Sequence, residues 1–183
     1  MSATAQLGTD RQQLLAALRE SREAYIACVE NVPETAASIR LSETSWSILE
    51  IAEHVAAAEH GMFRGLELGT EKTSSPNYEM DGEIGKRGRN RQVKGEAPER
   101  SRPKGRWSNL ADAIVAFENS RANTMAFVEK GESDPRKIEW QHPLFGALDG
   151  HQVLLLMSAH VERHTAQIEE IKATPEYKAA ASK

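Results

Sequence analysis

Two histidines four residues apart stand out in the last strongly patterned segment of the chain. The pentapeptide HVERH places His160 and His164 about one helical turn apart, so both imidazoles would lie on the same face of a helix. Imidazole nitrogens are common ligands of divalent metal ions, but a metal site needs at least a third ligand from another part of the chain. The alternative is a chance pair on a solvated surface. The elements that carry the two histidines must distinguish these interpretations.

Four segments carry apolar residues at helical spacing and predict four helices of about twenty residues each. They span residues 11–30, 47–68, 109–130 and 151–172. Residues typical of helix ends flank them: Thr9 or Asp10, Ser47 with Glu50, Ser108, and Asp149 or Gly150 at the starts, and Pro33, Gly69, Gly131 and Pro175 at the ends. No stretch alternates clearly enough between apolar and polar residues to predict a strand.

Four helices of this length predict an all-α four-helix bundle, as a single domain over residues 1–183 with its core at about 10–172. The second and third helices are joined by a connection of roughly forty residues, 69–108, which is long enough for a crossover between parallel helices. Residues 86–106 hold nine basic and two acidic residues, and we expect this segment to be mobile or only partly ordered. Residues 174–183 are expected to form a C-terminal tail.

The periodicity of the helices supplies a candidate third ligand, His54. It lies on the apolar face of the second helix, and His160 and His164 lie on the apolar face of the fourth. Three interior histidines on two helices of a bundle can converge on one ion. The remaining histidines fit this arrangement less well: His60 and His151 are rotated away on their helices, and His142 lies in a loop that the sequence does not place.

A buried histidine is more often a hydrogen-bonded core residue than a ligand. Three unpaired imidazoles in one core would each cost stability, however, and a shared metal satisfies all three together. Two rival metal motifs fail on spacing. A zincin needs H-E-x-x-H, but Val161 follows His160, and no Glu lies three residues before any candidate ligand, as a di-iron bundle requires. Three imidazoles leave an open position for water or substrate.

Composition limits the other classes of function. The net charge of −4 argues against a generally basic nucleic-acid binder, although residues 86–106 alone carry about +7 and leave about −11 on the rest of the chain. Trp107 is the only aromatic residue beside that segment, so we expect no tight nucleic-acid binding. Cys28 is the only cysteine, and no apolar signal segment or membrane span is indicated. A cytoplasmic protein is the simplest expectation.

Two stretches together resemble a known family. They are SWSILEIAEHVAAAEHGMF and HPLFGALDGHQVLLLMSAHVERHTAQIEEI, and the features that match are a tryptophan before the second helix, a histidine within it, and the pattern H-x-x-R-H-x-x-Q-I in the fourth: Trp46, His54, His160, Arg163, His164, Gln167 and Ile168. This combination is similar to that of the DinB-like (DinB/YfiT-like) superfamily, over about residues 10–172. The resemblance implies a four-helix bundle with a long crossover, a three-histidine site for zinc, nickel or a similar ion, and homodimers as one form. It also implies low-molecular-weight thiols, such as bacillithiol or mycothiol, as cofactors of some members.

Two hypotheses from different classes follow. The first is a metal-dependent enzyme, such as a thiol-dependent S-transferase or a hydrolase, acting on a small-molecule substrate. The second is a non-catalytic stress-response or binding module with a structural metal. Three ligands favour the first, because structural sites are closed by four protein ligands. Glu53 and Glu59 are candidates for a general base, but we expect them on a solvated face. Cys28 is expected to be a small buried residue, and Arg163 to lie either against an anionic substrate or paired with a nearby Glu.

Overall fold

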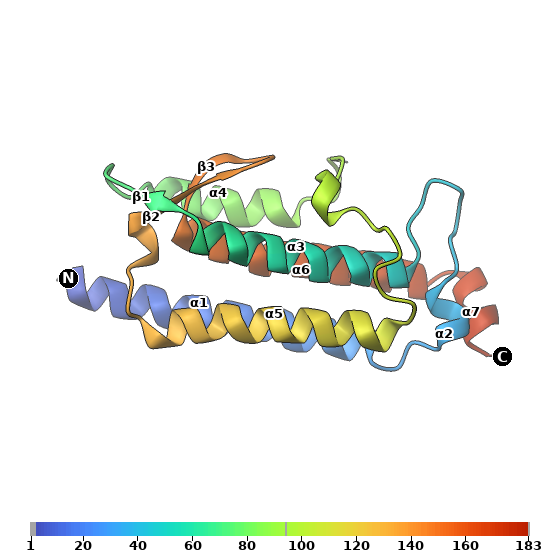
Figure 1. Ribbon diagram of the computed structural model, residues 1–183. Helices are drawn as coiled ribbons and strands as arrows, with labels where there is room; N and C mark the ends of the chain where they lie inside the picture. The colour runs from blue at the N-terminus through green and yellow to red at the C-terminus, as the bar shows by residue number, and fades with distance from the viewer. Residues whose placement is uncertain (1–2, 94, 183) are drawn as a thin grey trace.

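The computed structural model describes residues 3–93 and 95–182 and confirms the predicted four-helix bundle. The four long helices are α1 (Ala3–Val29), α3 (Ile48–Glu67), α5 (Leu110–Lys130) and α6 (Gly150–Lys172). Helices α3 and α5 run side by side in one direction, and α1 and α6 run in the other (Figure 1). The connection between α3 and α5 is therefore a crossover, as its length predicted.

The predicted helix starts are confirmed in part. Ser47 forms a capping box with Glu50 at the start of α3. Helix α5 begins one residue later than expected, because the side chain of Asn109, and not that of Ser108, accepts the Asp112 N–H at 2.8 Å. Gly131 ends α5 with a φ of 60°, a left-handed conformation that glycine adopts without a steric penalty.

The two ends of the chain contain more helix than the sequence predicted. Helix α1 begins at Ala3, so the expected caps Thr9 and Asp10 lie inside it and the predicted start at residue 11 was wrong. The C-terminal segment is not a simple tail, because Thr174 caps a further helix, α7 (Pro175–Ala181). Helix α7 contacts the short helix α2 (Glu34–Ala37) at one end of the bundle (Figure 1).

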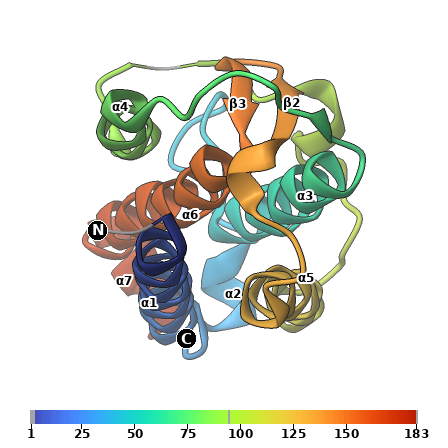
Figure 2. The same ribbon diagram turned by 90° about the vertical axis from the view of Figure 1, so that its left-hand side faces the viewer.

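A small antiparallel sheet corrects the expectation that the chain has no strands. Its order is β1 (Thr70–Glu71), β2 (Ile138–His142) and β3 (Gly146–Asp149), and β2 and β3 form a hairpin in which Trp140 pairs with Leu148. Strands of two to five residues are too short to show an alternating pattern in the sequence. The hairpin lies over the helices near the end of α3 (Figure 2).

The crossover contains helical structure, and in the basic segment 86–106, which was expected to be mobile or only partly ordered, residues 86–89 and 99–101 are helical and most of the other described residues are not. The crossover includes α4 (Tyr78–Arg89), which packs along α6, and a single 3₁₀ turn, η1 (Glu99–Ser101), which contacts α3. A Cβ added to Gly88 would lie 2.8 Å from the Ala159 Cβ, so glycine permits the close approach of α4 to α6. Two of its cations pair with acids on α6, through the ion pairs Arg89–Glu162 and Arg91–Glu170. The acidic surface of the bundle thereby neutralises part of this segment.

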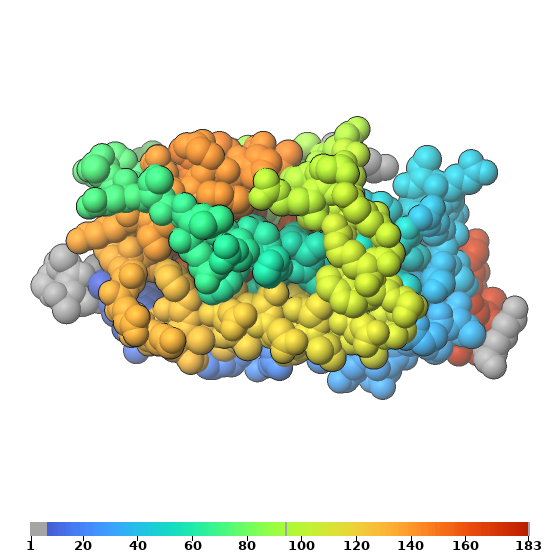
Figure 3. All heavy atoms as spheres, in the orientation of Figure 1, coloured from blue at the N-terminus to red at the C-terminus, as the bar shows by residue number. Residues whose placement is uncertain are grey.

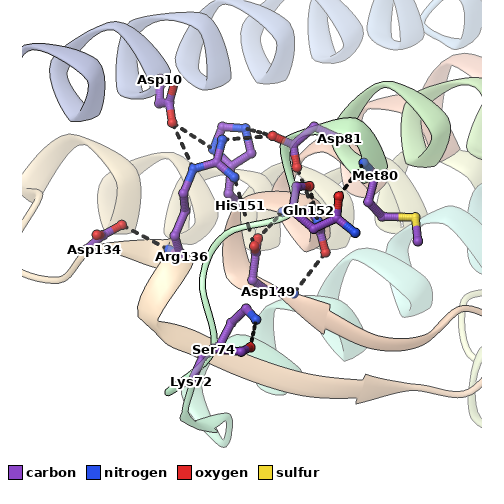
Figure 4. A network of polar contacts seen from close by, with 11 residues as sticks. Asp10, Lys72, Ser74, Met80, Asp81, Asp134, Arg136, Asp149, His151 and Gln152 are labelled. Atoms are coloured by element: carbon purple, nitrogen blue, oxygen red, sulfur yellow. Dashed lines mark hydrogen bonds and ion pairs between the residues drawn. The ribbon is translucent and has the colours of Figure 1, made fainter. Parts of the chain in front are cut away.

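A buried polar network fixes the start of α4 (Figure 4). Arg136, in the 3₁₀ turn η2 (Pro135–Lys137), donates to Asp10 of α1 and to Asp81 of α4, each at 2.9 Å. The His151 ring lies between the same two carboxylates, with nitrogen–oxygen distances of 4.0 and 3.8 Å. Asp10, Asp81 and Arg136 come from three separate elements that are distant in the sequence. The network therefore ties α4, within the crossover, to α1 and to the η2 turn.

One ion pair lies entirely inside the bundle. Glu59 of α3 and Arg121 of α5 are fully buried and are joined by two hydrogen bonds of 2.6 and 3.0 Å. The remaining guanidinium nitrogen of Arg121, Nη1, donates to the Leu18 carbonyl and the Ser21 hydroxyl of α1. The expectation that Glu59 lies on a solvated face was therefore wrong.

In the described part of the chain, no helix is both long and apolar enough to cross a membrane.

Candidate metal centre

The structure brings together the three histidines that the sequence singled out. His54 comes from α3, and His160 and His164 come from adjacent turns of α6, which packs beside α3. Their candidate ligand nitrogens all lie within 4.8 Å of one another, and the Nε2 atoms of His54 and His160 are 3.0 Å apart. His54 and His164 are buried, and His160 is half-buried.

Hydrogen bonds outside the cluster orient two of the rings. Nδ1 of His54 lies 2.8 Å from the carbonyl oxygen of Ser101, and Nδ1 of His164 lies 2.8 Å from Oε1 of Gln167. An oxygen acceptor requires the proton on Nδ1, so Nε2 of each ring carries the lone pair. This arrangement is typical of histidine ligands, whose second nitrogen is held by a carbonyl or a side-chain oxygen.

The geometry and charge of the cluster fit a divalent ion. Two nitrogens bound to one tetrahedral zinc at about 2.0–2.1 Å would lie about 3.3 Å apart, close to the 3.0 Å between His54 and His160. Burial, and repulsion from neighbouring imidazoles, hold the pKa values of His160 and His164 well below the ordinary value, and burial also lowers that of His54. Neutral imidazole is the form that binds a metal.

Glu53 supports His54 through the crossover, which corrects the expectation that Glu53 lies on a solvated face. Its side chain is 2% exposed and accepts hydrogen bonds from the Lys104 N–H (2.7 Å), the Gly105 N–H (2.9 Å) and Nη1 of Arg106 (2.6 Å). Burial raises the pKa of Glu53, but these hydrogen bonds outweigh it and the pKa is lowered. The same segment carries Ser101, whose carbonyl orients His54.

Two cavities adjoin the cluster. The larger, of about 340 Å³, is lined by all three histidines and by residues of α4 and the following loop. The smaller, of about 90 Å³, is mostly apolar and lies between α3, the η1 turn and the β2–β3 hairpin. Figure 3 shows the recess between this part of the crossover and the hairpin, above α3. A molecule in either cavity would therefore reach the histidine cluster directly.

His142 lines the apolar cavity together with His54 and His160, a position that the sequence did not predict. Its Nδ1 accepts the backbone N–H groups of Leu144 (3.1 Å) and Phe145 (3.3 Å), so the ring proton lies on Nε2. Burial lowers its pKa to about 4. The residue is thus a neutral hydrogen-bond donor beside the cluster.

The other candidate groups lie away from the site. His60 is exposed on α3, and His151 belongs to the Arg136 network. Cys28 is 5% exposed, and burial raises the pKa of its thiol to about 12, which confirms a small buried residue. No sequence signal could have placed His142, because a short hairpin and not a helix brings it to the cluster.

The fold agrees with what comparison with known proteins shows. The family model of the DinB superfamily matches residues 6–168, and the chain belongs to this superfamily. Among solved structures, YfiT from Bacillus subtilis matches with a TM-score of 0.62 and 15% identity over 94% of this chain and 88% of its own, and is described as a probable metal-dependent hydrolase with an unusual four-helix bundle topology. TT2238, a four-helix bundle protein, matches with a TM-score of 0.54 and 21% identity over 90% of this chain and 99% of its own. No curated protein matches the sequence.

Proposed function

We propose that this protein is a metal-dependent enzyme that binds one divalent ion, zinc or nickel, through His54, His160 and His164. The observation that carries the proposal is the convergence of the three rings at the wall of two cavities. Within the described residues the cluster holds three ligand side chains and no fourth, the arrangement typical of catalytic sites. The description of YfiT as a probable metal-dependent hydrolase supports the same class.

The reaction that fits this site is S-transfer or hydrolysis on a small molecule in the cytoplasm. When bound, the metal would supply a nucleophile by lowering the pKa of a bound water, or of a low-molecular-weight thiol acting as cofactor. Ser101 and Gln167 hold two ligand rings in place, and His142 offers an N–H to a substrate in the apolar cavity. The apolar lining of that cavity limits the access of water to the reacting groups.

The alternative is a non-catalytic stress-response or binding module in which the metal is structural. This alternative requires a fourth protein ligand, and the described part of the chain provides none at the cluster. Exchange of the fourth ligand separates the two functions. Cobalt-loaded enzyme would change its visible spectrum when a small thiol is added, whereas a closed structural site would not.

Metal analysis of the purified protein tests the proposal first. We expect one zinc or nickel ion per chain, and we expect His160→Gln to lower the affinity by more than about 100-fold, since losing a ligand costs more than losing its outer hydrogen-bond partner. His60→Gln is the matched control, because His60 is exposed on α3 and outside the cluster. A wild-type protein that binds neither metal, or a His160→Gln variant that binds as tightly as wild type, would refute the proposal.

A screen of low-molecular-weight thiols with small electrophiles then tests the reaction. Turnover should require both the metal and an intact His160. Metal binding without turnover, together with a spectrum that no thiol alters, would favour the structural alternative.

A further inference from the structure

Arg163 is a cation in the wall of the larger cavity. It directly precedes His164 on α6, is half-buried, and donates one hydrogen bond from Nη2 to the Val93 carbonyl at 3.2 Å. Among residues 3–93 and 95–182, none forms a salt bridge with it. The two nearby glutamates of α6 are engaged elsewhere, Glu162 with Arg89 and Glu170 with Arg91. The sequence-based alternative, an Arg163–Glu pair, is therefore not formed.

The same cavity wall holds a second cation, Arg87. Arg87 lies over the Phe145 ring, 4.9 Å from its centre. The acidic residue on this wall, Glu96, is paired with Arg102 at 2.8 Å. With neutral imidazoles as ligands, a divalent ion would add two further positive charges. A partly enclosed cavity of this kind strongly favours an anionic occupant, because charges interact more strongly where water is scarce.

We propose that the molecule bound beside the metal carries an oxyanion group, a carboxylate or a phosphate, and that Arg163 binds this group. This inference rests on the proposed metal site. The planar guanidinium has five N–H donors, of which one is used by Val93, and its fork matches the paired oxygens of either group. The adjoining apolar cavity, lined by Ala58, Met62 and Trp140, accepts the rest of a small molecule. The substrate class is thus a small organic anion with a short apolar portion.

Three small thiols that differ in charge test the inference on cobalt-loaded protein. The probes are 3-mercaptopropionate (anionic), 2-mercaptoethanol (neutral) and cysteamine (cationic), and the thiolate-to-cobalt absorption band reports binding of each. We expect the anionic thiol to bind about tenfold more tightly than the neutral one, and the cationic thiol most weakly. Acetate and inorganic phosphate then compete with 3-mercaptopropionate. If acetate displaces it at the lower concentration, the bound group is a carboxylate, and if phosphate does so, the bound group is a phosphate. Displacement by neither overturns the inference.

Substitutions then assign the preference to Arg163. Arg163→Gln should remove the tenfold preference while cobalt still binds, and Arg163→Lys should keep part of it. Arg64→Gln is the charge-matched control, since Arg64 pairs with Glu67 on the surface of α3 and should leave the preference unchanged. An Arg163→Gln variant that still prefers the anionic thiol overturns the inference.

The outcomes separate this inference from the proposed function. A wild-type protein that does not take up cobalt, zinc or nickel removes both. A wild-type protein that binds metal but binds the three thiols equally well removes only the role of Arg163. If Arg163→Gln fails to fold, the ranking of the thiols on wild-type protein and on Arg163→Lys decides the question.

Discussion

The hydrogen bonds of Glu53 make a specific prediction about how the crossover controls the metal centre. In Glu53→Gln, the side-chain oxygen can replace Oε1, which accepts from Lys104 and Arg106, but the amide NH₂ then faces the Gly105 N–H. One charge-assisted hydrogen bond becomes a contact between two donors. A hydrogen bond to a charged group contributes about 1.5–3 kcal/mol, so we expect a loss of unfolding free energy in that range.

The effect should extend to the metal. The segment that Glu53 holds also positions the Ser101 carbonyl, which accepts from His54 at 2.8 Å. Loss of an outer hydrogen-bond partner typically weakens metal binding by about 10–100-fold, and we expect about tenfold here because Ser101 is displaced and not removed. Chelator competition measures the affinity, and urea unfolding of the metal-free protein measures the stability.

Two further variants test this result. Arg106→Gln keeps both backbone bonds to Glu53 but removes the Nη1 bond to Glu53 and the bonds to the carbonyls of Arg100 and Arg102, so it should also loosen the segment around Ser101 and lower both quantities. Glu67→Gln makes the same chemical change at an exposed site of α3 and should alter neither. A Glu53→Gln protein that is destabilised but binds metal as tightly as wild type would refute the link between the crossover and His54.

Three further predictions concern acid, the buried ion pair and the basic crossover. Burial lowers the pKa values of the three clustered histidines in the folded protein, so the unfolded chain binds more protons below about pH 6.5. The stability, measured by thermal melting, and the bound metal, measured by chelator competition, should therefore both fall from pH 7.5 to 5.5. Unchanged values would contradict histidine ligation. Arg121→Met should lower the free energy of unfolding, measured in urea, by about 3–5 kcal/mol, because it leaves Glu59 charged and buried. Adding Glu59→Gln should recover part of this loss. A double variant that is no more stable than Arg121→Met would contradict this explanation. Despite the basic residues 86–106, the protein should not bind DNA with a dissociation constant below about 1 μM at physiological salt, as measured by fluorescence anisotropy. Tighter binding with a steep salt dependence would favour the binding-module alternative.

The features that the sequence predicted well are those set by local periodicity. The spacing of His160 and His164, and the apolar face that carries His54, follow from residues within each helix, so the convergence of the three rings could be predicted. The capping box of Ser47 is likewise a pattern of neighbouring residues. The bundle and its long crossover followed from the number and length of such segments.

The features that the sequence did not predict depend on distant partners. Glu53 and Glu59 have the spacing of a polar helix face, but one is covered by residues 104–106 and the other by Arg121. Their burial depends on contacts more than 50 residues away, which no helical pattern contains. The basic segment was expected to be mobile or only partly ordered on composition alone, yet two of its cations, Arg89 and Arg91, have acidic partners on α6. Composition does not show whether a charge run faces its own bundle or solvent.

The bundle carries the histidines and the loops form much of the cavity wall, which has a consequence for engineering. The three histidines of the cluster lie on α3 and α6, whereas much of the cavity wall is formed by exposed residues of the loop after α4 and of the hairpin tip, such as Val93, Gly95 and Leu144. Changes at these three positions reshape the space beside the histidines without altering a residue of the bundle core. A combinatorial library restricted to them would therefore vary substrate preference on a constant scaffold, and each clone could be compared at nearly unchanged stability and metal content.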